Sequence, residues 1–81
     1  MSTTRETLSE WFDRGTQQKA THMIVVCDTF DHEDYPVYVM PGQDAAKIAA
    51  EYSKDMQRVM EVYKMSIDKA TQLNARRVYN L

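Results

Sequence analysis

An uninterrupted apolar run in the first half of the chain predicts its central structural element. Residues 23–27 read MIVVC, with three consecutive β-branched residues and no charged position. A short apolar run of this kind is typical of a strand that is buried on both faces. The sequence therefore predicts a central strand at about residues 22–28.

A second extended segment follows an acidic stretch. Residues 35–40 read YPVYVM, favour β-structure, and are ended by Pro41 and Gly42. Pro36 has no backbone N–H, so it suits the start of a strand and not the interior of a central ladder. We expect a strand at about 36–40. Residues 28–34 are too acidic for a sheet interior, and we expect them to form the loop of a hairpin.

Helical periodicity precedes the central strand. The positions i, i+3, i+4 and i+7 of one helix face are Leu8, Trp11, Phe12 and Gly15. Thr3 and Glu6 fit a capping box, and the pattern predicts a helix over about 4–19. Gly15 either lets another element approach the helix closely or ends the helix early, since glycine costs about 1 kcal/mol inside a helix.

The second half of the chain supports two interpretations. Asp44 begins a helix at about 44–53, and its apolar stripe continues with a repeat of 11 residues, which fits one long helix over 44–78. Against this, residues 59–65 are apolar on both strand faces, Ser53 to Asp55 suit a turn, and Ser66 suits the cap of a last helix at about 67–77. We favour a third strand at about 58–65, because a helix of roughly 35 residues is atypical of a small domain.

Together these elements predict a single α+β domain over residues 1–81. A small antiparallel sheet would be covered by helices, and the alternative is a β-hairpin with one long C-terminal helix. A domain of this length buries only about 60% of its unfolded surface, so its core is thin. Burial against a second copy would add to that core, and we expect a homo-oligomer.

Charge and composition restrict the class of protein. The net charge is −2, which gives no support for nucleic-acid binding. Between Ala20 and Ala46 there are five acidic residues and no Lys or Arg, whereas basic residues dominate from Lys47 onward. The single cysteine fits a reducing compartment, and no signal-like or membrane-length apolar run is present. We therefore expect a cytoplasmic protein that binds neither membranes nor nucleic acid.

The central sequence resembles a known group. Residues 20–39 read ATHMIVVCDTFDHEDYPVYV, with WFDRG before them and MQRVMEVYKM after them. This pattern resembles a group of small uncharacterised proteins from bacteria and their phages, over about Leu8 to Arg77. The group has no established activity, so the resemblance implies no catalytic residue. Similar sequences carry a glycine near Lys54 that implies a break before Met56; this chain has none, which leaves the break open.

The acidic loop is the first candidate site. One interpretation is a solvated hairpin loop whose aspartates satisfy turn amides, a second is a surface for a polar or cationic partner, and a third is a metal site. Hard cations need six or more oxygen ligands, and the loop has neither EF-hand spacing nor its central glycine. Zinc would require more Cys or His. We expect no metal and no cofactor.

Aromatic and basic residues form the second candidate site. Phe30 either tucks back to anchor the loop, which we favour, or stacks on a ligand, and Tyr35 and Tyr38 would line the same pocket. Arg76 and Arg77 either bind phosphate or favour a helix C-terminus through the helix dipole. The complete set of candidate binding residues is Asp28, Phe30, Asp31, His32, Glu33, Asp34, Tyr35, Tyr38, Arg76 and Arg77.

No known catalytic motif is present in the sequence. His32 suits a general base, but no nucleophile or oxyanion donor is recognisable near it in the sequence, and we expect no enzyme. The leading hypothesis is a binding protein that presents the acidic loop to a partner protein. The alternative is a protein that sequesters a small nucleotide signal. The resemblance makes this alternative relevant, because phage genomes encode small binders of that kind.

Overall fold

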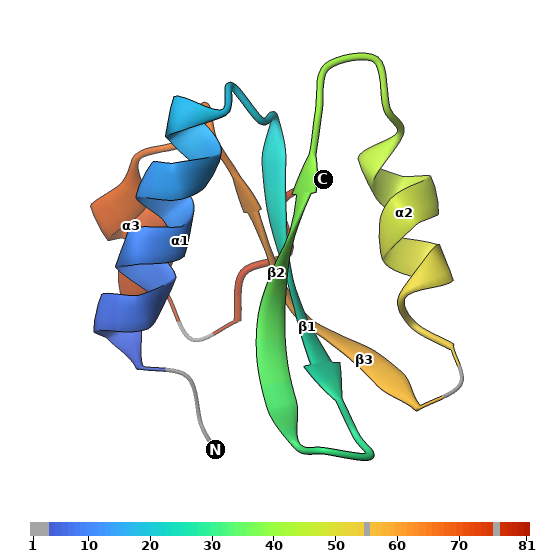
Figure 1. The fold of residues 1–81 in the computed structure, drawn as a ribbon. Helices are drawn as coiled ribbons and strands as arrows, with labels where there is room; N and C mark the ends of the chain where they lie inside the picture. Colours follow the sequence, from blue (N-terminus) through green and yellow to red (C-terminus); the bar gives the residue numbers. More distant parts are fainter. Residues whose placement is uncertain (1–3, 55, 76) are drawn as a thin grey trace.

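The computed structural model describes residues 4–54, 56–75 and 77–81. The elements in chain order are α1 (Arg5–Gln17), β1 (His22–Asp28), β2 (Glu33–Val39), α2 (Ala45–Glu51), β3 (Gln57–Lys64) and α3 (Lys69–Asn74). The strands form one antiparallel sheet in the order β2-β1-β3, so the apolar run lies at its centre. Figure 1 shows α1 and α3 on one side of the sheet and α2 on the other. The predicted α+β fold and its third strand are confirmed, and the long C-terminal helix is not formed.

Several element boundaries differ from those predicted. β2 begins at Glu33 and not at residue 36, because the acidic residues beside the hairpin turn also pair with β1. Their side chains meet solvent there, so the pairing buries little charge. α1 ends at Gln17, and α3 has only six residues, with Asp68 and not Ser66 as its N-cap. Three predictions fall on residues outside the described part of the chain. They are the cap at Thr3, the turn that includes Asp55 and the phosphate contact of Arg76.

Pro36 lies in the middle of β2, opposite Val25, and not at the start of the strand. β2 is an edge strand, so alternate residues direct their backbone groups away from β1. A proline in such an outward position costs no ladder hydrogen bond. It also removes a donor from the edge that another strand would need for pairing.

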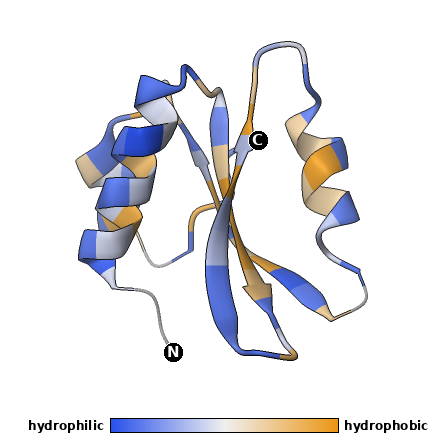
Figure 2. Cartoon of the chain, viewed as in Figure 1, coloured by the Kyte–Doolittle hydropathy of each residue, from blue (hydrophilic) through white to orange (hydrophobic). Residues whose placement is uncertain are grey.

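Alternation along β1 divides the core into two halves. Ile24 and Val26 face α2, in a cluster completed by Val39, Ala45, Ala49 and Val62. Met23 and Val25 face α1 and α3, in a cluster completed by Phe12, Tyr63 and Val78. The Phe12 and Tyr63 rings meet edge to face, with centroids 6.5 Å apart. Figure 2 shows apolar residues along the strands between the helices, which is where both clusters lie.

Gly15 is the point at which α1 contacts the sheet most closely. A Cβ at this position would lie 2.8 Å from the Tyr38 ring and 2.8 Å from the Met65 side chain. The Tyr38 hydroxyl donates to the Trp11 carbonyl over 2.7 Å, which fixes the ring along the helix. Helix α1 continues through Gly15, so the close-approach interpretation is correct.

Both ends of α1 are capped within the chain. Thr4 is the N-cap, and its hydroxyl accepts a hydrogen bond from the Thr7 N–H. At the other end Lys19 has a φ of 62°, with Lys19 N donating to Thr16 O and Ala20 N to Gly15 O. This is a Schellman motif with lysine in the left-handed position that glycine usually occupies.

The last residues of the chain extend the sheet beyond β3. Val62 N donates to Val78 O over 2.7 Å, and Asn80 N donates to Val62 O over 3.0 Å, in a parallel arrangement. Gln72 of α3 holds this segment in place: its amide bonds Lys64 N, Lys64 O and Ile67 O, and its Oε1 also accepts from Asn80 Nδ2. The side chain is 2% exposed and uses its full hydrogen-bonding capacity. It links α3, the end of β3 and the C-terminal segment.

Candidate functional site

The loop between β1 and β2 consists of four residues, Thr29–His32, and its backbone is fixed by hydrogen bonds. Thr29 N donates to Met56 O over 2.8 Å, and His32 N donates to Asp28 O over 2.7 Å. The Asp28 carboxylate accepts from Phe30 N over 2.9 Å and from Asp31 N over 3.4 Å. Every N–H of the loop therefore has an acceptor within the chain. His32 completes the turn with a φ of 59°, in the left-handed region that histidine tolerates better than most residues.

Phe30 lies at the tip of this loop and is 71% exposed. The prediction that it tucks back as a loop anchor is wrong. The Asp28 carboxylate already fixes the turn through two amides, so the loop needs no apolar anchor. The ring is therefore held in solvent by an ordered backbone.

A second exposed apolar side chain lies beside the loop. Met56, directly before β3, is 54% exposed, and its carbonyl bonds the Thr29 amide. We call the surface formed by residues 28–33, which are the loop and the strand residue on either side of it, and by Met56 the hairpin end. Met56 was not among the predicted site residues, because only the pairing of β3 with β1 brings it there. The sequence signals for it were the predicted turn before it and its flexible apolar side chain, which suits an interface.

The predicted acidic residues have different environments. Asp28 is engaged by the loop amides, whereas Asp31, His32 and Glu33 are exposed. Asp34 lies one step along β2, opposite Cys27, whose thiol hydrogen-bonds to it. The interpretation of the loop as one whose aspartate satisfies turn amides is correct for Asp28.

Arg58 lies close to the predicted acidic residues, which the sequence did not indicate. It pairs with Cys27 from β3, so Asp34, Cys27 and Arg58 form one row across the sheet. Burial raises the pKa of the Cys27 thiol, Asp34 raises it further, and the Arg58 guanidinium partly opposes these effects. The thiol is therefore not activated as a nucleophile. Strand β3 therefore brings the positive charge of Arg58 to the segment between Ala20 and Ala46, which has no Lys or Arg of its own.

Tyr35 and Tyr38 do not line one pocket, which corrects the prediction. Tyr35 packs on the α2 side of the sheet, 6.5 Å from the Tyr52 ring, and its hydroxyl bonds Gln57. Tyr38 packs on the α1 side against Gly15. Their numbers differ by three, and alternation along a strand directs such residues to opposite faces.

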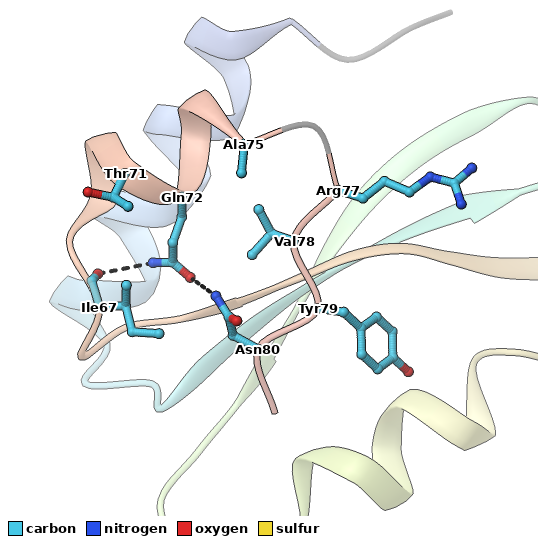
Figure 3. Close-up of a pocket in the computed structure, with 8 residues that line it drawn as sticks. All are labelled: Ile67, Thr71, Gln72, Ala75, Arg77, Val78, Tyr79 and Asn80. Carbon is cyan, nitrogen blue, oxygen red and sulfur yellow. Dashed lines mark hydrogen bonds between the residues drawn. The ribbon is translucent and has the colours of Figure 1, made fainter.

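Of the predicted arginine pair, Arg77 does not join the hairpin end either. Arg76 lies outside the described residues, and Arg77 is exposed in the C-terminal segment. Arg77 lies beside an open hollow of about 300 Å³ (Figure 3), lined by Ile67, Thr71, Gln72, Ala75, Arg77, Val78, Tyr79 and Asn80. In Figure 3 the side chains of Arg77 and Tyr79 extend away from the Gln72 amide. The hollow is therefore lined by both polar and apolar residues, and Arg77 and Tyr79 point away from its Gln72 side.

No metal-binding group emerges from the described residues: nowhere in them do three His, Cys, Asp or Glu side chains gather closely enough to hold an ion. His32 serves as a turn residue on the surface of the hairpin end. Within the same residues, no helix has the length and apolar character needed to span a membrane.

Comparison with protein-family models, with curated proteins and with solved structures gave no match for this chain.

Proposed function

We propose that this chain is a non-enzymatic interaction protein that presents the hairpin end to a partner protein in the cytoplasm. The observation that carries the proposal is the Phe30 ring, 71% exposed on a loop whose amides are all hydrogen-bonded. Burying such a ring in a partner would contribute about 1.5–3 kcal/mol. Aromatic side chains at the centre of an interface commonly supply most of its binding energy.

The fixed loop adds to this argument. A flexible loop loses conformational freedom when it binds, and that loss weakens association. Here the Asp28 carboxylate and the Met56 carbonyl order the loop before any partner arrives. Met56 adds a second exposed apolar side chain on backbone that is hydrogen-bonded to the loop, and exposed apolar residues with a polar rim are typical of interaction sites.

The proposal includes a homo-oligomer, because the core is thin. Neither sheet edge favours strand pairing between copies: β2 carries Pro36, and the C-terminal segment covers β3 at Val62. Association would therefore use side-chain surfaces. Light scattering at tens of micromolar tests this part, and a strict monomer would remove it while leaving the partner-binding proposal in place.

A photo-crosslinking experiment tests partner binding. Benzoylphenylalanine replaces Phe30 in one variant and Tyr79 in a control variant, since Tyr79 is also an exposed aromatic, at 57%. We expect a discrete crosslinked protein from position 30 in cells that express the chain, and none from position 79. Met56→Ala in the position-30 variant should lower the yield. The same products from both positions, or none from position 30, would contradict the proposal.

Sequestering of a small nucleotide-like ligand is the second candidate. It is favoured by the hollow beside α3, where Arg77 and Tyr79 offer a cation for phosphate and a ring for stacking. Thermal-shift measurements with nucleotides and cyclic dinucleotides test it, with Arg77→Ala as the matched variant. A ligand that raises the melting temperature of the wild type and not of the variant supports this candidate. Absence of any shift rules it out.

A further inference from the structure

We infer that the partner surface is a socket for Phe30 bordered by lysine or arginine side chains, and that it belongs to a protein other than a second copy of this chain. This inference rests on the proposed function and specifies the chemistry of the partner. It follows from the distribution of carboxylates around the apolar centre of the hairpin end and from the shape of the two sheet edges.

The apolar centre consists of Phe30 and Met56. The hydrogen bond between Thr29 N and Met56 O places the start of β3 directly against the loop, so the two exposed side chains project from adjoining backbone. An aromatic ring beside a thioether chain fits an apolar recess, because both side chains lose contact with water when covered.

Two carboxylates close to this centre are not the ones that accept hydrogen bonds from the loop amides. Asp28 is occupied by the loop amides, and Asp34 accepts from Cys27 in the row that also contains Arg58. Asp31 and Glu33 are exposed and follow Phe30 by one and three residues. A surface that receives Phe30 must lie close to both carboxylates, and positive charge on it would attract them.

A second copy that met this one hairpin end to hairpin end would not provide such a surface. Two hairpin ends brought together about a twofold axis would oppose Asp31 and Glu33 with the same residues, and like charges in contact disfavour association. Pairing through the sheet edges is limited by Pro36 and by the segment beside Val62. A basic surface on a different protein would face neither the repulsion between like charges nor the limits on strand pairing.

Selection from a random peptide library displayed on phage tests the inference. The library is panned on the wild-type chain and depleted on a variant carrying both Phe30→Ala and Met56→Ala. Both side chains are exposed, so the variant keeps the fold. We expect the retained peptides to contain Lys or Arg together with apolar residues that can form a recess around Phe30. Retained peptides that are neutral or acidic overturn this inference and leave the proposed function intact. Absence of any retained peptide overturns both.

Charge reversal provides the second measurement, made on one retained peptide. Asp31→Lys with Glu33→Lys should raise the Kd about tenfold or more, mainly by slowing association, and the affinity of the wild type should fall with added salt. Glu10→Lys with Glu51→Lys is the matched control, because both residues are exposed on helices and the net charge changes equally. Equal effects of the two double variants would overturn the inference, since only net charge would then matter.

Discussion

Gly15→Ala is expected to destabilise the chain although alanine favours helices more than glycine. The new Cβ would lie 2.8 Å from Met65 Cε and 2.8 Å from Tyr38 Cε1, where ordinary contacts begin at 3.4 Å. The methionine end can rotate away. The Tyr38 ring has less freedom, because its hydroxyl is bonded to the Trp11 carbonyl of the same helix. Either the ring or the helix must therefore move by about 0.6 Å, the difference between 3.4 and 2.8 Å.

The two opposing contributions set the size of the effect. Overpacking of this kind costs typically 1–3 kcal/mol, whereas replacing glycine by alanine in a helix gains about 1 kcal/mol. We expect a net loss of about 1 kcal/mol in the free energy of unfolding, measured by urea denaturation followed by circular dichroism. In a domain of this size that corresponds to about 4–8 °C in melting temperature.

A double-mutant cycle identifies the cause. Tyr38→Phe removes the hydroxyl that fixes the ring, so Gly15→Ala should cost less in that background than in the wild type. Gln17→Ala, at an exposed position of the same helix, is the control and should have little effect. A gain of stability from Gly15→Ala, or the same cost in both backgrounds, would refute the view that the fixed Tyr38 ring requires glycine.

Four further predictions concern other parts of the fold. Lys19→Gly should stabilise the chain by about 0.5–1 kcal/mol in urea denaturation, because lysine occupies a left-handed position there; a loss would contradict the role of the Schellman motif. Gln72→Leu should lower the free energy of unfolding by about 2–4 kcal/mol, because it removes four hydrogen bonds, and a change below 1 kcal/mol would argue against this. Asp28→Ala should speed hydrogen exchange of the two amides that its carboxylate binds, whereas Asp28→Asn should preserve their protection; equal exchange in both variants would speak against the turn. Burial, and then the positive charge of Lys64, lower the pKa of His22, so the unfolded chain binds a proton first as the pH falls below about 6.5, and stability should decline there. His22→Gln should lose less stability than the wild type between pH 7.5 and pH 5.5, and parallel pH profiles would exclude this assignment.

Most of the fold was predictable because its signals are local. The β-branched run of β1, the Asp44 cap of α2 and the apolar face of α1 depend on near neighbours in the sequence. The extent of β2 was not predictable, because Glu33 and Asp34 can pair with β1 only where their side chains reach solvent, at the turn end of an edge strand. The sequence likewise gave no indication that Gln72 would tie α3 to the C-terminal segment, since that contact requires the finished tertiary structure.

The candidate site was predictable in position and not in detail. The acidic loop does face outward. No local sequence pattern predicts that Phe30 and Met56 are exposed there, or that Arg58 pairs with Cys27. Tyr35 and Tyr38 illustrate the same limit: their proximity in sequence suggested a shared pocket, and strand alternation separates them. Sequence spacing identifies which residues are neighbours along the chain, whereas the pairing register decides which ones meet.

The position of Val78 in the core has a consequence for how the chain matures. This residue fills the cluster beside Met23 and Tyr63, and the adjoining backbone pairs with Val62. The α1 side of the sheet therefore stays open until residue 78 has been synthesised and has left the ribosome. Until that moment the nascent protein would expose Phe12 and its neighbours, so a stop codon placed just upstream of Val78 should yield a product that chaperones retain or proteases remove.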